Sequence, residues 1–139
     1  MKKALFIILI FLSGRLMAQS AHDLTIKVNG YKHLNGTVFI ALYNSEENYM
    51  KVEKASYKAI FQPKALTGMF IFHALPDSVY AAALFYDENA NGKLDTNVFG
   101  IPKEKNGFSN NAKGMFGPAK FDKAKFVHHS NQEITVTLE

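Results

Sequence analysis

Oxygen-bearing side chains recur at regular spacing just after one of the most apolar segments of the chain. The stretch DENANGKLD has an acid or amide at its first, third, fifth and ninth positions and a glycine at its sixth. Oxygens with this spacing can converge on one cation when the backbone wraps around it, and the glycine permits the sharp turn. The stretch therefore predicts a calcium site whose ligands are Asp87, Asn89, Asn91, Asp95 and the main-chain carbonyl of Lys93.

The match to a calcium loop is incomplete at its end. A bidentate glutamate belongs at the twelfth position, where this chain has Val98, and the flanking segments have the pattern of strands. Glu104 could supply a later carboxylate if the chain folds back. Two carboxylates and two amides carry little charge, which predicts weak calcium binding, towards the millimolar range. A tight turn capped by the same side chains is the alternative interpretation.

Patterns that indicate catalysis are few. The sequence has no Gly-x-Ser-x-Gly elbow, no His-Glu-x-x-His, no phosphate loop and no dinucleotide-binding glycine pattern. It also has no cysteine, which excludes thiol nucleophiles and zinc–thiolate sites. A carboxylate pair, Asp87 with Asp95 or Glu104, could serve hydrolysis. We therefore predict a non-enzymatic module, with a small envelope hydrolase as the alternative.

A second candidate for binding combines amides with aromatic rings further along the chain. The polar residues are Asn106, Ser109, Asn110 and Asn111, and the rings are Phe108 and Phe116. Such a set could hold a glycan or a peptide. Tryptophan, the commonest sugar platform, is absent. The favoured interpretation is therefore that the amides satisfy the loop backbone and the rings join the core.

The N-terminus has the layout of a secretory signal peptide. Two lysines precede the apolar run Ala4–Leu12, and a less apolar segment with small and polar residues follows up to Ala18. This run is well short of the roughly 20 residues that span a bilayer, and an uncleaved anchor is the alternative. We therefore expect residues 1–18 to be removed. Residues 19–139 then form one exported domain, in the periplasm or at the cell surface, with no membrane span.

Removal of the signal peptide changes the net charge. The full chain has 16 Lys and Arg against 12 Asp and Glu, or +4. Residues 19–139 keep 16 − 3 = 13 basic and 12 acidic groups, or +1, and contain no arginine. Because arginine is the usual reader of phosphate and guanine, a nucleic-acid partner is not expected. The expected partner is a protein or glycan of the cell envelope.

Most of the exported part has the pattern of strands. Residues 24–30 alternate apolar and polar side chains, which marks a strand with one face on a core. A turn at Asn35-Gly36 is expected to join this strand to the next as a hairpin. Residues 79–86 are apolar on both faces, as in a central strand. The predicted strands are residues 24–30, 36–44, 55–61, 68–75, 79–86, 124–128 and 133–138. Seven short strands predict an all-β antiparallel sandwich.

One long loop, Asp87–Phe121, interrupts the succession of strands. It is rich in Asn, Gly, Lys and Phe, and a loop of this length is usually functional or contains further structure. Its apolar residues are expected to fold back onto the sandwich. These residues are Phe99, Ile101, Phe108, Met115, Phe116 and Phe121.

Several blocks of sequence carry a family resemblance. They are VFIALYNSEENYMK (38–51), DENANGKLDTN (87–97), GIPKE (100–104), GFSNNA (107–112) and Gly117-Pro118. In this order they resemble the signature of the uncharacterised bacterial family DUF2141. The chain departs from the family pattern at Tyr86, where many members have histidine, and at Ser78, where glycine is usual.

The resemblance implies an exported single-domain protein with an immunoglobulin-like or prealbumin-like sandwich, and it implies no known activity. If the family histidine has a chemical role, Tyr86 removes that role here. The DENANGKLD block is also similar to calcium loops in β-sandwich repeats of bacterial surface adhesins. Residues and resemblance together predict a structural or ligand-binding module with a calcium-stabilised loop.

Overall fold

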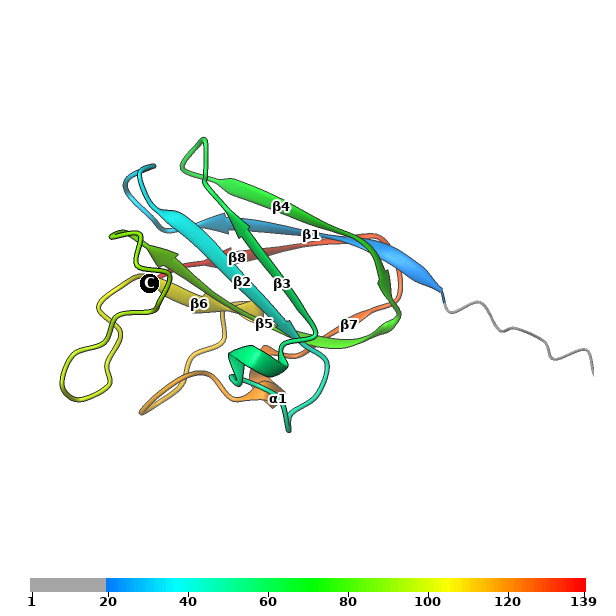
Figure 1. Ribbon diagram of the computed structural model, residues 1–139. Coiled ribbons are helices and arrows are strands. Elements are labelled where there is room, and N and C mark those ends of the chain that lie inside the picture. The colour runs from blue at the N-terminus through cyan, green and yellow to red at the C-terminus, as the bar shows by residue number, and fades with distance from the viewer. Residues whose placement is uncertain (1–19) are drawn as a thin grey trace, which may run out of the picture.

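The computed structural model describes residues 20–139, so the predicted signal peptide lies outside the described residues. The described chain folds into two β-sheets that pack face to face (Figure 1). No helix between residues 20 and 139 is long and apolar enough to cross a membrane. In chain order the elements, with η for a 3-10 turn, are β1 (Ala21–Asn29), β2 (Thr37–Tyr43), η1 (Val52–Lys54), β3 (Tyr57–Phe61), β4 (Gly68–Pro76), β5 (Ser78–Asp87), β6 (Asn106–Phe108), η2 (Ser109–Asn111), α1 (Phe121–Ala124), β7 (Phe126–His128) and β8 (Gln132–Thr137).

The two sheets confirm the all-β sandwich predicted from the sequence. The smaller sheet has the strand order β4-β1-β8, and the larger has the order β3-β2-β5-β6, with β7 also paired to β5. Residues 79–86 therefore do form a central strand, as predicted. β1 and β8 pair in parallel, whereas the prediction was antiparallel throughout. Period-two alternation could not reveal this, because it is the same for both strand directions.

The predicted hairpin between the first two strands is wrong. β1 and β2 belong to different sheets, so the connection through Asn35 and Gly36 crosses from one layer to the other. Both strands bury one alternating face in the same core, and they meet across that core rather than edge to edge. A glycine is needed at position 36 for another reason, because a Cβ atom there would lie 2.5 Å from the ring of Tyr86.

The long loop Asp87–Phe121 contains regular structure that the sequence pattern did not show. It includes β6, η2 and the start of α1, and a bridge joins Thr96 to Pro102. Phe108 and Phe121 are partly buried, as expected for residues that fold back. The same expectation is wrong for four others, because their segments form tips that stand away from the sandwich. These exposed residues are Phe99, Ile101, Met115 and Phe116.

Two tyrosines with buried hydroxyl groups offer a matched test of hydrogen bonding in the fold. The Tyr86 hydroxyl donates to the carbonyl of His33 (2.5 Å) and accepts from the N–H of Gly36 (2.8 Å). The buried hydroxyl of Tyr49 has no partner among residues 20–139. Because Tyr86→Phe leaves two main-chain groups unpaired, we expect it to lower the free energy of unfolding by about 1–3 kcal/mol.

The matched change Tyr49→Phe removes the same atom but breaks no hydrogen bond. We expect it to leave the free energy of unfolding unchanged to within about 0.5 kcal/mol, or to raise it. Urea unfolding of both variants measures the contrast. Equal losses of stability in the two variants would show that the Tyr86 hydrogen bonds contribute nothing specific.

Candidate functional site

Asp87, the last residue of β5, organises the loop that follows it. Its side chain is 1% exposed, and its carboxylate oxygens accept hydrogen bonds from the main-chain N–H groups of Asn91 (3.3 Å) and Gly92 (2.7 Å). Gly92 has a φ of 74°, in the left-handed region that glycine adopts without strain. The chain therefore turns sharply around a buried carboxylate.

Three more of the predicted ligands gather at this turn. Asn89 Nδ2 donates to Asp95 Oδ2 at 2.6 Å, and Asn91 Nδ2 lies 3.0 Å from both carboxylate oxygens of Asp95. The Oδ1 atoms of the two asparagines accept main-chain N–H groups, from Asn91 at 3.1 Å and from Lys93 at 2.8 Å. The fold thus brings Asp87, Asn89, Asn91 and Asp95 into one small region.

Glu104 holds the returning part of the loop against its beginning. It is 8% exposed, and its two carboxylate oxygens accept from the main-chain N–H groups of Glu88 (3.1 Å) and Asp95 (3.0 Å). The N–H of Lys103 donates to the carbonyl of Asp95 at 2.8 Å. Both oxygens of Glu104 are therefore engaged, and it would have to give up a hydrogen bond to bind a cation.

These contacts bear on both interpretations of the loop. Side chains that accept local N–H groups are what a capped turn requires, and residues 20–139 contain no group of three His, Cys, Asp or Glu side chains placed to hold a metal. The four converging residues still supply carboxylate and amide oxygens, and a half-turn of each asparagine amide would present oxygen in place of nitrogen. This donor set fits a weak site for a hard cation such as calcium.

An apolar groove crosses the outer face of the larger sheet, the face turned away from the core. Phe39 of β2 and Phe85 of β5 stack at its centre, with ring centroids 4.7 Å apart. The strand register places two rows of neighbours on its floor, Ile60-Phe39-Phe85-Asn106 and Lys58-Ala41-Ala83-Phe108. Its volume is about 510 Å³, within the range of small-molecule sites.

Two loops close the ends of the groove. Met50 and Val52 lie beyond the Tyr43 end of β2, and residues 92–94 lie beyond the Asp87 end of β5, the opposite end of this strand pair. The loop that turns around Asp87 therefore forms one wall of the groove. The segment that holds the predicted calcium ligands therefore also shapes the groove.

The groove carries little charge. Its two charged lining residues are Lys58 and Lys93, and neither forms an ion pair within residues 20–139. Burial, with a smaller contribution from Glu53, raises the pKa of the Tyr43 phenol, so this lining residue stays neutral at physiological pH. The groove therefore suits an apolar body, and any charge on the ligand would be negative.

The sequence analysis missed this groove, although a signal was present. The outward-facing residues of β2 and β5 are apolar, whereas an outer sheet face that contacts water is normally polar. The apolar outward face of residues 79–86 was interpreted only as a sign of a central strand. The outward-facing apolar residues are Phe39, Ala41, Tyr43, Ala81, Ala83 and Phe85.

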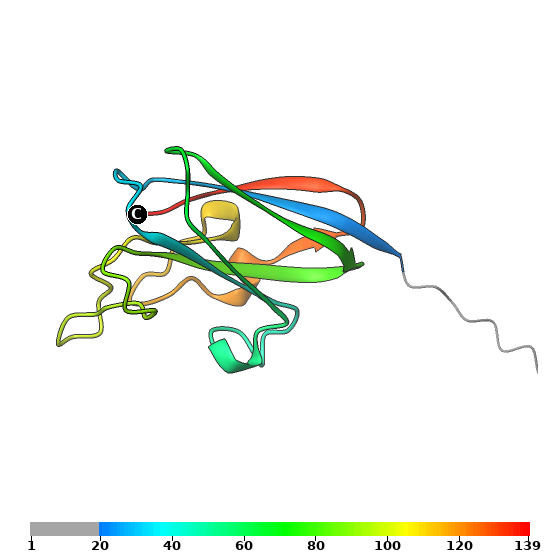
Figure 2. The same cartoon turned by 45° about the horizontal axis from the view of Figure 1, so that its top comes forward.

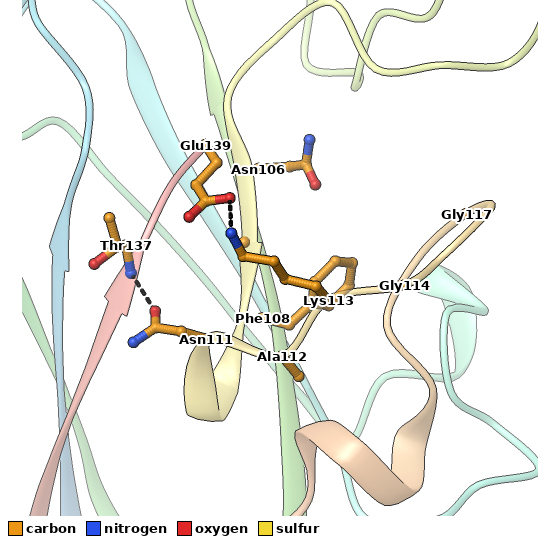
Figure 3. A pocket seen from close by; sticks show the side chains of 10 residues that line it. Asn106, Phe108, Asn111, Ala112, Lys113, Gly114, Gly117, Thr137 and Glu139 are labelled. Atoms are coloured by element: carbon orange, nitrogen blue, oxygen red, sulfur yellow. Dashed lines mark hydrogen bonds and ion pairs between the residues drawn. The ribbon is translucent and has the colours of Figure 1, made fainter.

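A smaller cavity of about 260 Å³ lies between β6 and the end of β8 (Figure 3). Asn111 Oδ1 accepts from the N–H of Thr137 at 2.8 Å, and Lys113 Nζ lies 2.7 Å from a carboxylate oxygen of Glu139. Both contacts are made between residues that line the cavity. The side chains of Asn111, Lys113 and Glu139 are thus already paired with one another or with the backbone.

Ser109 and Asn110, from the set that could hold a glycan or a peptide, also form hydrogen bonds with the main chain. Buried Ser109 accepts from the N–H of Ala82 (2.8 Å) and donates to the carbonyl of Ala124 (2.5 Å). Asn110 donates its amide to two carbonyls in residues 123–125. These contacts join the loop to β5 and α1. They support the interpretation that the amides satisfy the loop backbone.

The fold and the site define a small all-β sandwich with one elaborated loop beside an apolar groove. The chain belongs to the DUF2141 family, which is described as an uncharacterized protein conserved in bacteria and whose family model matches residues 26–136. The match includes the loop around Asp87 and both strands that carry the stacked phenylalanines. No curated protein and no solved structure matches the chain.

Proposed function

We propose that this protein is an exported, non-enzymatic module that binds a small ligand with an apolar body in the groove of the larger sheet. The groove itself carries this proposal, because an apolar hollow with stacked aromatic rings lies on a sheet face that core packing leaves open. Lys58 and Lys93 favour a ligand with a negatively charged end group.

Export and calcium complete the proposal. The layout of residues 1–18 supports export to the periplasm or the cell surface. A weakly bound calcium ion would hold the loop of Asp87, Asn89, Asn91 and Asp95 in place, with the carbonyl of Lys93 as a further ligand. Since residues 92–94 line the groove, calcium would stabilise one wall of the binding site.

The geometry favours binding over hydrolysis by loop carboxylates. Asp87 and Glu104 are buried, and each accepts two main-chain hydrogen bonds. Asp95 accepts the amides of two asparagines. Carboxylates held in this way stabilise a loop, and none of them lines the groove.

The groove is tested with 1-anilinonaphthalene-8-sulfonate, a dye with an apolar aromatic body and one negative charge. The sample is the processed protein recovered after export, with its N-terminus verified by mass spectrometry. Ala83→Trp places a large ring in the floor of the groove, and we expect it to weaken dye binding by about tenfold or more. Fluorescence titration measures the dissociation constants.

Ile71→Trp is the matched control, because it adds the same ring to the outer face of the smaller sheet, where Ile71 is exposed. It should leave dye binding unchanged, and both variants should keep the thermal midpoint of the wild type. The proposal fails if the folded wild type does not bind the dye, or if Ala83→Trp binds it as well as Ile71→Trp does.

A further inference from the structure

Two loop tips expose apolar side chains almost completely. The first tip is residues 97–101 and the second is residues 114–117. Both lie at the end of the sandwich opposite the entry into β1, and Figures 1 and 2 agree on this placement. The exposed fractions are 94% for Val98, 84% for Phe99, 59% for Ile101, 89% for Met115 and 100% for Phe116. Exposed apolar side chains that gather at one end of a molecule mark a candidate contact surface.

Four of the five main-chain N–H groups in the first tip donate hydrogen bonds within the tip. Asn97 Oδ1 accepts the N–H groups of Phe99 (2.9 Å) and Ile101 (3.0 Å), and Asn97 O accepts that of Gly100 (3.0 Å). The N–H of Asn97 donates to Ile101 O at 2.9 Å, and the bridge between Thr96 and Pro102 closes the base. The tip therefore presents apolar side chains and few open main-chain donors. A tip with few open donors enters the headgroup region of a membrane at lower cost than a tip with many.

Lysines outnumber acids in the segment of the sequence that contains both tips. Between residues 97 and 120 there are four lysines and one acid, or 4 − 1 = +3, and the remainder of residues 19–139 has 9 basic and 11 acidic groups, or −2. The one acid, Glu104, is buried against main-chain N–H groups. Lys113 also pairs with Glu139. The lysines are Lys103, Lys105, Lys113 and Lys120.

We propose that the two tips dock the protein on an anionic lipid surface. Phe99 and Phe116 enter the headgroup region, and the lysines of the same segment meet the negative charge of the lipids. The contact is shallow and reversible, because only five apolar side chains take part and the chain has no cysteine to carry an acyl group. The scarcity of open main-chain donors in the first tip favours lipid over a protein partner, which would use such donors.

A unique tryptophan can report on this docking, because the chain contains no tryptophan of its own. Phe99→Trp places the reporter at the first tip, and Val127→Trp places it on β7, where Val127 is 59% exposed but outside the tips. The processed protein is mixed with phosphatidylcholine vesicles, with and without phosphatidylglycerol. We expect a blue shift of the Phe99→Trp emission with the anionic vesicles only, and none for Val127→Trp.

A second variant tests both tips without a reporter. Phe99→Ser with Phe116→Ser should reduce co-sedimentation with anionic vesicles by about tenfold or more, because two exposed rings are lost. The matched control Met69→Ser with Val127→Ser removes exposed apolar groups elsewhere and should bind as the wild type does. Docking is refuted if wild-type protein does not bind anionic vesicles, as expected if the tips contact a protein instead. Equal blue shifts at positions 99 and 127 also refute it.

Discussion

Replacing Asp87 with alanine is expected to lower the free energy of unfolding by about 3 kcal/mol. The Asp87 carboxylate is buried and accepts the N–H groups of Asn91 and Gly92, and hydrogen bonds to a charged group contribute about 1.5–3 kcal/mol each. Relaxation of the loop recovers part of the sum. Urea unfolding in EDTA measures this loss in the absence of divalent cations.

Glu88→Ala is the matched control for this loss. It removes one carboxylate from the next residue, where the side chain is exposed and the main-chain N–H to Glu104 is kept. We expect its free energy of unfolding to stay within about 0.5 kcal/mol of the wild type. A similar loss in both variants would mean that net charge, and not the turn around Asp87, determines the stability of the loop.

The same two variants separate a calcium site from a capped turn. If calcium binds, a concentration ten times its dissociation constant should raise the free energy of unfolding of wild type and Glu88→Ala by about 1.4 kcal/mol. Asp87→Ala should not respond, because it lacks the first ligand. If millimolar calcium leaves the wild type unchanged, the loop is a capped turn. In that case Asp87→Ala should lower the free energy of unfolding by the same amount in calcium as in EDTA.

Strand positions could be predicted because alternation reports directly on burial. Leu24, Val28 and Leu84 lie on the alternating strand faces that pack into the core. The pairing of the strands was harder to predict from the sequence than their positions. The Asn35-Gly36 signal is local, whereas sheet membership depends on contacts between residues far apart in the chain. For this reason the first two strands were located correctly and paired wrongly.

The candidate site shows the same division between local and distant contacts. The convergence of Asp87, Asn89, Asn91 and Asp95 follows from spacing within nine residues, so the sequence predicted it. Glu104 was recognised as a late carboxylate, but its role as an acceptor for main-chain N–H groups depends on how the loop returns. The groove combines side chains from four strands and two loops, and no local pattern describes such a set.

Gly36→Ala is expected to lower the free energy of unfolding by about 3 kcal/mol or more. The new Cβ atom would lie 2.5 Å from the Tyr86 ring and 2.6 Å from the carbonyl oxygen of Asp87. The Tyr86 ring is buried and its hydroxyl is held by two hydrogen bonds, so it cannot move aside easily. Overpacking of a filled core costs about 1–3 kcal/mol, and a clash with backbone adds to this.

Gly92→Ala separates this close approach from the general effect of replacing a glycine. Gly92 has a left-handed φ of 74°, but no heavy atom lies within 4 Å of the place that a Cβ atom would take, so alanine there meets only backbone strain of about 1–2 kcal/mol. Urea unfolding should therefore rank Gly36→Ala well below Gly92→Ala in stability. The opposite ranking would mean that turn geometry, and not contact with Tyr86, requires the glycine. Since Thr37, the next residue, pairs with Asp87, the predicted ranking would show that the close approach of β5 at the start of β2 requires a residue without a side chain.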